Sequence, residues 1–200
     1  MFYETGAGHG LPFDPIKAIV APRPIGWIST IDAEGRHNLA PYSFFNALGS
    51  RPPIVCFSSE GMKDSAANAK ATGEFVANLA TMALAEAMNA TSKTVPHGVD
   101  EFALAGLAVA PCRLVRPGRV AASPAALECK VLQVIEIADL SGQPIDRHLV
   151  IGQVVGVHID DAYIRDGRFD TAAAQPLARC GYRDYAVVRE VFEIVRPDEM

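Results

Sequence analysis

The sequence lacks any long apolar run and any recognisable targeting segment. Its hydrophobic stretches fall well short of the roughly 20 residues that a membrane-spanning helix needs. The first residues, Met1 to Gly6, show no basic segment followed by an apolar one, so they do not resemble a secretory signal peptide. The sequence therefore predicts a protein that is neither anchored in a membrane nor exported.

Positive charge is also in short supply. Lys and Arg number 18 against 23 Asp and Glu, which gives a formal net charge of −5. Because nucleic-acid-binding proteins present basic surfaces, this balance disfavours nucleic acid as a partner. Any anionic ligand must be held by a few cations gathered in one place.

Cysteine is sparse and dispersed. Cys56, Cys112, Cys129 and Cys180 stand far apart, and no CxxC pair occurs. This pattern disfavours both a zinc site and a disulfide framework. The histidines show no metal-ligand spacing either; they are His9, His37, His97, His148 and His158. The sequence predicts no metal site and a reducing, cytoplasmic environment.

The common glycine-rich nucleotide motifs are absent. No strand is followed by GxGxxG, and neither a GxxxxGK loop nor a GxSxG turn occurs. The glycines of residues 6–10 have no strand before them and Pro12 soon after. Residues 1–12 are therefore predicted to be a loose N-terminal segment and not a phosphate loop.

The composition that is present is that of a globular domain. Hydrophobic residues make up 50% of the chain and charged residues 20%. This balance predicts a packed core, and 200 residues is an ordinary size for a single domain. We expect one domain over residues 1–200.

β-forming runs dominate the chain. Residues 25–31 and 37–40 flank a short loop that contains Gly35, the pattern of a hairpin. Because proline cannot extend a strand ladder, we expect the second strand to end at Pro41 and residues 42–46 to form a loop. Further strands are predicted at 53–57, 74–79, 125–138, 149–159 and 186–195, helices at 64–71 and 82–90, and loops at 58–63, 91–102 and 175–185. This order favours a mainly β fold, an antiparallel barrel with a few short helices.

One stretch, Asn38 to Ser65, surrounds an apolar run with small polar residues and one lysine. Such a lining suits a planar, polar, phosphorylated ligand. Lys63 and Ser65 stand at the start of a predicted helix, where backbone N–H groups and the helix dipole favour an anion. The alternative is a solvated lysine beside an ordinary helix cap, and these residues by themselves leave both interpretations open.

Four segments, taken in order, carry a family resemblance that extends from about Ile16 to Tyr185. They read Pro22-Arg23-Pro24-Ile25-Gly26-Trp27-Ile28-Ser29-Thr30, Asn38-Leu39-Ala40-Pro41-Tyr42-Ser43-Phe44-Phe45-Asn46, Arg51-Pro52-Pro53 and Lys63-Asp64-Ser65. In this spacing they resemble the flavin reductase-like family, whose members include flavoredoxins and the flavin reductase components of two-component monooxygenases.

The resemblance implies an FMN-binding split β-barrel that forms a homodimer with flavin near the subunit interface. Asn38 to Ser43 would follow the isoalloxazine ring and ribityl chain, while Lys63 and Ser65 would hold the phosphate. The cofactor-binding residues that it implies are Asn38, Leu39, Ala40, Pro41, Tyr42, Ser43, Phe44, Asn46, Ser58, Ser59, Lys63, Ser65 and Lys93.

The function that the resemblance implies is an NAD(P)H:flavin reductase. NADH or NADPH would pass hydride to FMN with no essential catalytic side chain, and electrons would go on to a monooxygenase or another acceptor. One alternative is a flavoredoxin-like electron carrier without a nicotinamide site. Another is a split barrel that binds haem, pyridoxal phosphate or no cofactor.

The chain departs from many relatives after Arg179. It has Cys180-Gly181-Tyr182 where they have Leu and Gly-Gly. In some relatives this loop lies near the flavin. Cys180 is thus either a reactive thiol beside the cofactor, favoured as a thiolate by Arg179 and Arg183, or a small apolar residue that fills the place of Leu.

Overall fold

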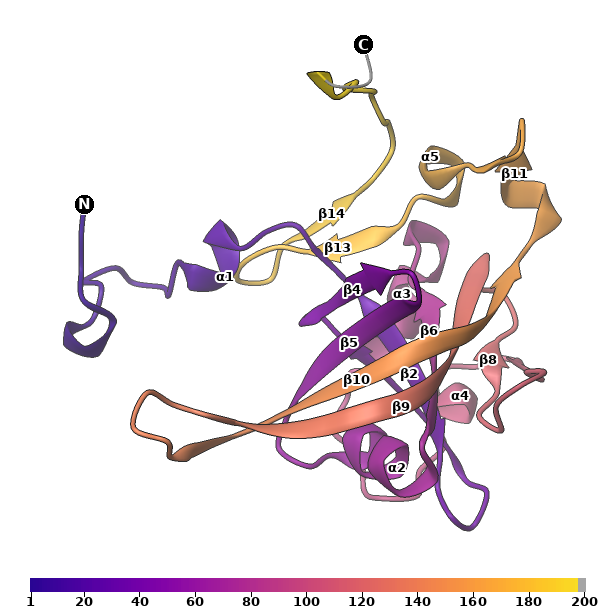
Figure 1. Cartoon of the computed structure of the whole chain (residues 1–200), viewed down its shortest axis with the longest axis horizontal. Coiled ribbons are helices and arrows are strands. Elements are labelled where there is room, and N and C mark those ends of the chain that lie inside the picture. Colours follow the sequence, from indigo (N-terminus) through magenta and orange to yellow (C-terminus); the bar gives the residue numbers. More distant parts are fainter. Residues whose placement is uncertain (198–200) are drawn as a thin grey trace.

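The structure, a computed structural model that describes residues 1–197, is built around one antiparallel sheet of seven strands (Figure 1). The strand order is β3-β2-β6-β9-β10-β5-β4. The strands are β2 (Gly26–Ile31), β3 (His37–Tyr42), β4 (Phe45–Ser50), β5 (Pro53–Glu60), β6 (Glu74–Leu79), β9 (Ala125–Ala138) and β10 (Pro144–Ile159).

The sheet curls into a barrel because its two edges are consecutive in the sequence. β3 and β4 form the opposite edges of the sheet, yet only Ser43 and Phe44 lie between them. Two residues cannot span a flat seven-stranded sheet, so the edges must meet. Within residues 1–197 no ladder joins β3 to β4, and the barrel is therefore split along this seam.

Alternation along β2 explains how the core divides. Ile28 points into the barrel, where it packs with Phe57, Phe75 and Val150. Its neighbour Trp27 points to the other side of the strand and packs in a second apolar cluster. That cluster contains Ile25, Trp27, Leu39, Ala80, Met88, Phe102, Val120 and Leu177.

The longest strands, β9 and β10, form a hairpin that contributes Cys129, Val150 and Val154 to the cluster inside the barrel. Their register shifts three times, between Pro144 and Arg147, between Ile151 and Gly152 and between Val154 and Gly156. At the second shift only glycine fits, because a Cβ on Gly152 would lie 2.4 Å from Cε1 of Phe75. These bulges bend the hairpin around the barrel interior.

Short helices and strands lie around the barrel. The helix α2 (Asp64–Thr72) buries Ala66 and Ala69 against the interior cluster and ends at Gly73, whose φ of 72° is left-handed. The other elements outside the barrel are η1 (Thr5–Ala7), α1 (Ile16–Ile19), η2 (Met82–Leu84), α3 (Ala85–Ala90), α4 (Glu101–Leu104), β7 (Val109–Ala110), β8 (Arg119–Val120), η3 (Asp161–Tyr163), β11 (Ile164–Arg165), β12 (Arg168–Phe169) and α5 (Thr171–Ala174).

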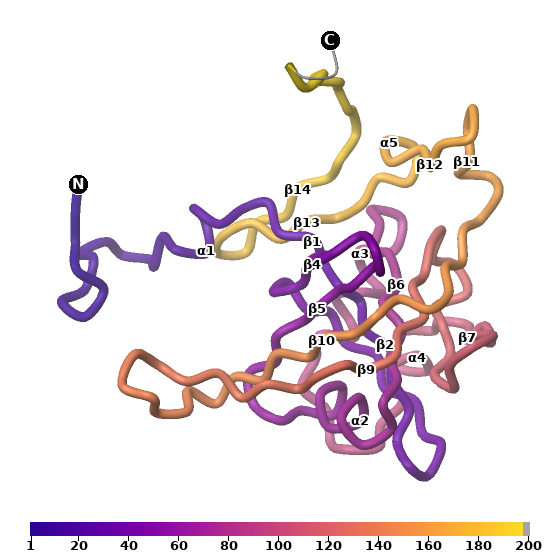
Figure 2. Tube along the Cα trace, viewed as in Figure 1, coloured from indigo at the N-terminus to yellow at the C-terminus, as the bar shows by residue number. Residues whose placement is uncertain are grey.

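A small sheet joins segments from the two ends of the chain. β1 (Arg23–Pro24), β13 (Leu177–Arg179) and β14 (Tyr185–Val187) lie in the order β1-β13-β14. The N-terminal segment before α1 and residues 188–197 extend away from the barrel (Figure 2). None of the helices within residues 1–197 is both long and apolar enough to cross a membrane.

The predicted barrel and most predicted strands are confirmed, but several boundaries were wrong. Residues 42–46 are not a loop, because β3 runs to Tyr42 and β4 begins at Phe45. Pro41 is tolerated inside β3 since β3 is an edge strand, where the missing N–H can face outward. The predicted loop 58–63 is shorter than expected, since β5 continues to Glu60.

The C-terminal part also differs from the prediction. The predicted loop 175–185 contains strand β13, which pairs with β1 across more than 150 residues of sequence. The predicted strand 186–195 is reduced to β14, which ends at Val187. An apolar run was read as a strand there, although a strand needs a partner and β14 is paired only with β13.

Candidate functional site

A cleft of about 290 Å³ opens beside the first turn of α2, and we call it the helix-start cleft. It brings together seven of the predicted cofactor residues from three separate segments; they are Asn38, Ala40, Pro41, Tyr42, Lys63, Ser65 and Lys93. The other residues that line it are Asp64, Thr91, Ser92, Thr94, Val95, His97 and Glu101.

Two lysines, Lys63 and Lys93, line the helix-start cleft. The first turn of α2 follows Lys63, and no side chain caps its backbone N–H groups, so these donors remain for another partner. In the part of the chain that the structure describes, neither Lys63 nor Lys93 has an ion-pair partner. The nearby carboxylate of Asp64 instead contacts His97, with Oδ1 and Nδ1 3.0 Å apart. The arrangement suits a phosphate group.

The floor of the cleft is a buried polar network centred on Glu101. Its carboxylate accepts hydrogen bonds from Nδ2 of Asn38, at 3.0 and 3.1 Å, and from the backbone N of Leu39, at 3.0 Å. Oδ1 of Asn38 in turn accepts from Oγ of Ser65 at 2.7 Å. Burial raises the pKa of Glu101, and these hydrogen bonds offset the rise only in part.

In this network Asn38, Leu39 and Ser65 make contacts within the protein itself. Their side-chain or backbone polar groups are engaged within the protein, and Leu39 and Ser65 are fully buried. Sequence reasoning missed Glu101, which lay at the end of the predicted loop 91–102. No local signal was available, because its partners stand more than 60 residues away.

Tyr42 connects the floor of the cleft to the barrel core. Its ring packs against Phe57, with ring centres 4.8 Å apart. Burial raises the pKa of the Tyr42 hydroxyl, against hydrogen bonds with Ser65 and Ser59. The hydroxyl is therefore a neutral group at physiological pH, positioned between α2 and β5.

The remaining predicted cofactor residues lie outside the helix-start cleft. Phe44 is half exposed, and the guanidinium carbons of Arg23 and Arg147 each lie 5.8 Å from its ring centre. Ser43, which precedes Phe44 between β3 and β4, lines a different cleft.

Three of the predicted residues stand on β4 and β5. Asn46 is exposed, and its Oδ1 accepts from the following backbone N. Ser59 is fully buried and donates to the backbone O of Gly61 at 2.8 Å. Ser58 is partly buried, and its backbone N donates to the backbone O of Phe44, which continues the pairing of β4 with β5. None of these three lines the helix-start cleft.

A second cleft, of about 660 Å³, adjoins the first, and we call it the basic cleft. It shares Pro41 and Ser92 with the helix-start cleft. Its other lining residues are Lys17, Arg23, Ile25, Ser43, Met88, Asn89, Arg179, Cys180, Tyr182, Arg183 and Tyr185. The Cys180 loop, which the family resemblance places near the flavin, lines the basic cleft, and this cleft adjoins the helix-start cleft at Pro41 and Ser92.

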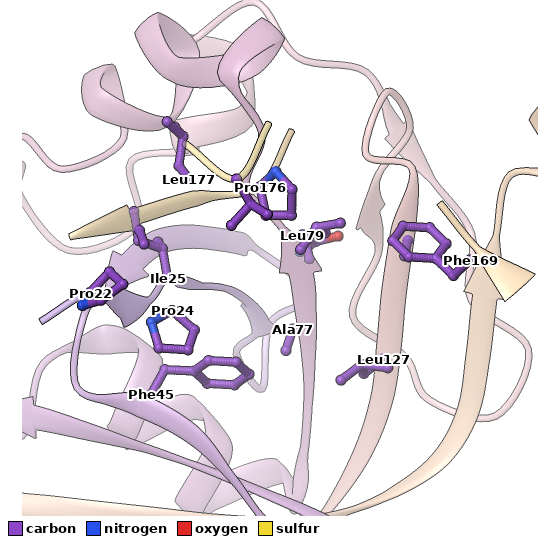
Figure 3. A pocket seen from close by; sticks show the side chains of 14 residues that line it. Pro22, Pro24, Ile25, Phe45, Ala77, Leu79, Leu127, Phe169, Pro176 and Leu177 are labelled. Atoms are coloured by element: carbon purple, nitrogen blue, oxygen red, sulfur yellow. The ribbon is translucent and has the colours of Figure 1, made fainter. Parts of the chain in front are cut away.

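A third cleft, of about 430 Å³, is apolar and contains none of the predicted cofactor residues. Figure 3 shows Phe45, Pro24 and Leu177 lining it between the barrel and the small terminal sheet. Because it offers almost no polar groups, it is suited to apolar side chains and not to a phosphorylated ligand.

Three groups that can bind metals converge elsewhere, which their sequence spacing did not predict. Ligand atoms of Cys112, Glu128 and His158 lie within 4.8 Å of one another. The Glu128 carboxylate accepts from the backbone N of Arg113 and of Leu114, as well as contacting Nε2 of His158. Burial and the neighbouring Glu128 raise the pKa of the Cys112 thiol to about 12. These contacts anchor the chain after Cys112 to strands β9 and β10.

Comparison with solved structures identifies proteins of the same architecture. The nitrilotriacetate monooxygenase component B of Bacillus cereus is 26% identical, with a TM-score of 0.84 over 94% of this chain and 100% of the other. The 2-nitrobenzoate 2-nitroreductase of Pseudomonas fluorescens is 25% identical, with a TM-score of 0.86 over 100% and 98%. A flavoredoxin of Desulfovibrio vulgaris, at 22% identity and a TM-score of 0.79 over 98% of each chain, shares the fold.

Sequence comparison gives a more specific result. A protein of Deinococcus radiodurans described as uncharacterized is 38% identical over 98% of this chain and 88% of its own length. The flavin reductase like domain profile matches residues 20–173, which is more than half of the chain. The chain therefore belongs to the flavin reductase-like domain family.

Proposed function

We propose that the protein binds FMN in the helix-start cleft and acts as an NAD(P)H-dependent flavin oxidoreductase. One observation carries the proposal. In a chain of this family, Lys63, Lys93 and the uncapped start of α2 converge on one cleft. Two relatives in fold are described as a monooxygenase component and a nitroreductase, which supports a redox role.

The residues present fit the phosphate end of FMN. The backbone N–H groups at the start of α2 donate, Lys63 and Lys93 supply charge, and both are free of carboxylate partners in residues 1–197. Asp64 is held by His97 and so opposes a phosphate less than a free carboxylate would. A charge-assisted contact of this kind is stronger than a neutral hydrogen bond.

The residues also fit the ring and ribityl portion. Ala40 and Pro41 offer a small, apolar strand wall that a flat ring can approach, and Pro41 continues this wall into the basic cleft. Glu101 fixes the position of this wall through Asn38 and Leu39. When bound, FMN supplies the hydride-accepting chemistry, and the chain supplies position and electrostatics. No side chain is assigned as a general acid.

The test is spectroscopic. The purified protein is titrated with FMN, and NADH or NADPH is then added without oxygen. We expect FMN to bind and its visible absorbance to be lost with one of the two nicotinamides. Failure to bind FMN would overturn the proposal. Binding without reduction by either nicotinamide would instead identify an electron carrier of the flavoredoxin type.

The assembly that we propose is a homodimer in the cytoplasm. Large apolar side chains stand exposed on both terminal segments, including Phe13, Ile19, Phe192 and Ile194. Solvent exposure of such side chains in extended segments favours burial against a second copy. Four free cysteines in the described chain agree with a reducing compartment. Sedimentation of the FMN-bound protein as a monomer at micromolar concentration would contradict the dimer.

A further inference from the structure

The basic cleft gathers positive charge in a protein whose net charge is −5. Four of its lining residues are cationic, namely Lys17, Arg23, Arg179 and Arg183, and none is acidic. Within residues 1–197 none of these four takes part in an ion pair with Asp or Glu. Positive charge that is gathered and left unneutralised in a cleft attracts an anionic ligand.

Arg23 is the buried member of this group. It is only 6% exposed. Its Nη1 donates to the backbone O of Lys17 and of Val20, its Nη2 donates to that of Cys180 at 2.8 Å, and its Nε has no partner. Carbonyl groups compensate only part of the cost of burying a charge. An anion in the cleft would supply the missing negative charge.

Arg179 presents its guanidinium in a fixed orientation. The group stacks on Tyr185, with Cζ 4.5 Å from the ring centre, and Nη2 donates to the backbone O of Tyr182 at 2.6 Å. A guanidinium that is held flat and already oriented binds a carboxylate in two-pronged fashion with little further loss of entropy.

The walls of the basic cleft are held together by close packing. A Cβ on Gly181 would lie 2.5 Å from that of Ala18, so only glycine lets the loop approach α1 this closely. Phe13 packs edge-on against Tyr182, with ring centres 5.8 Å apart. The rings of Tyr182 and Tyr185 and the side chains of Ile25 and Met88 add apolar and aromatic surface next to the cations.

We propose that the basic cleft binds a small aromatic carboxylate, with its carboxylate on Arg179 and Arg183 and its ring against the tyrosines. Because Pro41 and Ser92 line both clefts, such a ligand would lie next to the ring end of a flavin held in the helix-start cleft. The inference rests on the proposed function in one respect, namely that this ligand is a second substrate of the flavin site.

The experiment measures benzoate binding to the FMN-loaded protein by titration calorimetry, with benzamide as a neutral analogue of the same shape. We expect benzamide to bind at least roughly tenfold more weakly, since a hydrogen bond to a charged group is the stronger one. Arg179→Gln and Arg183→Gln should each weaken benzoate binding by roughly tenfold to a hundredfold. Arg179→Lys should also weaken it, because lysine keeps the charge and loses the planar fork.

The matched control is Arg168→Gln, which removes an exposed arginine outside the cleft. It should leave benzoate affinity unchanged, and an equal loss there would overturn the inference. Equal affinity for benzoate and benzamide would overturn it as well. NAD⁺, which cannot reduce FMN, and inorganic phosphate are titrated in parallel; if they bind with Arg179-dependent affinity and benzoate does not, the cleft is a phosphate site and the carboxylate inference is wrong.

The two proposals fail separately. FMN affinity, measured in the same samples, tests the helix-start cleft, while benzoate affinity tests the basic cleft. Benzoate binding without FMN binding would overturn the proposed function and leave the anion site standing. FMN binding without benzoate binding would overturn only the anion site.

Discussion

The barrel interior and the helix-start cleft share helix α2, yet they are built in different ways. The barrel face of α2 places Ala66 and Ala69 among apolar side chains, whose stabilisation depends on area and shape. The start of the same helix places Lys63 and Ser65 among polar groups, whose stabilisation depends on partners. Substitutions in the first region should change folding, and those in the second should separate folding from ligand binding.

The largest expected effect is in the barrel. Phe75 is fully buried between Phe57 and Gly152, so Phe75→Ala should lower the free energy of unfolding by about 3–5 kcal/mol. Urea unfolding measures this. Leu48→Ala is the control, since Leu48 is exposed on β4 and its loss should cost less than about 0.5 kcal/mol. A small effect of Phe75→Ala would show that the interior is not close-packed.

The next effect should appear in binding and not in folding. Lys63→Ala should weaken FMN binding by roughly tenfold to a hundredfold, because a hydrogen bond to a charged group contributes about 1.5–3 kcal/mol. Riboflavin, which lacks the phosphate, should bind equally well to both proteins. Lys70→Ala at the other end of α2 is the control. Equal losses for FMN and riboflavin in fluorescence titrations would exclude Lys63 as a phosphate ligand.

Substitution of Glu101 tests whether the floor of the helix-start cleft contributes both to folding and to FMN binding. Glu101→Ala leaves Nδ2 of Asn38 and the backbone N of Leu39 buried without an acceptor, which should cost about 1–3 kcal/mol of stability. FMN affinity should fall together with stability, since the strand wall loses its support. Glu101→Gln keeps one acceptor and should be intermediate in both. Unchanged thermal unfolding of Glu101→Ala would contradict this role.

A smaller, pH-dependent effect on the free energy of unfolding should come from Glu74, at the start of β6. Burial raises the pKa of Glu74, but hydrogen bonds from Lys130 and Arg116 outweigh it and leave the pKa below its usual value. A lowered folded-state pKa contributes stability above the unfolded pKa, and that stability is lost as the pH falls through the folded pKa. Both partners are half exposed, so the contribution is about 1 kcal/mol or less.

Denaturant unfolding of Glu74→Gln across the acid range measures this contribution. The variant should be less stable than the unchanged protein at neutral pH, and the difference should shrink as the pH falls below about 4, near the ordinary pKa of glutamate. A difference that stays constant with pH would mean that Glu74 acts through packing and not through its charge.

The smallest expected effect is on the rate at which Cys180 is alkylated. Cys180 is partly exposed and lines the basic cleft with Arg179 and Arg183, whereas Cys56 and Cys129 are buried. Cys180 should therefore be the first of these three to be alkylated, and bound FMN should slow the reaction. Mass spectrometry with and without FMN measures both. Absence of labelling in either state, or equal rates in both, would favour the alternative that Cys180 is a packed substitute for leucine.

Much of the barrel follows from local patterns in the sequence. The hairpin of β2 and β3 was predicted from two β-forming runs around Gly35, whose φ of +86° explains the glycine. The bounds of β9, Ala125 to Ala138, agree with the prediction. β4 was missed because its side chains are largely exposed and show no alternation, so its strand conformation depends on pairing with β5.

The candidate site was predictable only in part. Lys63, Lys93 and the start of α2 carried a local signal or a family resemblance, and the structure places them on one cleft. Glu101 carried none, because a buried carboxylate is identified by its partners and not by its neighbours in sequence. Arg23 stood between two prolines, and only the packing of α1 and the Cys180 loop around it shows that its charge is buried.

The sequence by itself determined most strands of the barrel, the start of α2 after Lys63 and the family, since alternation and turn residues act over a few positions. The tertiary structure decided which polar groups meet. The network of Asn38, Ser65 and Glu101 and the gathering of Arg23, Arg179 and Arg183 join segments separated by tens of residues or more. Their positions depend on how the barrel closes and where the terminal segments pack, and no local pattern encodes these contacts.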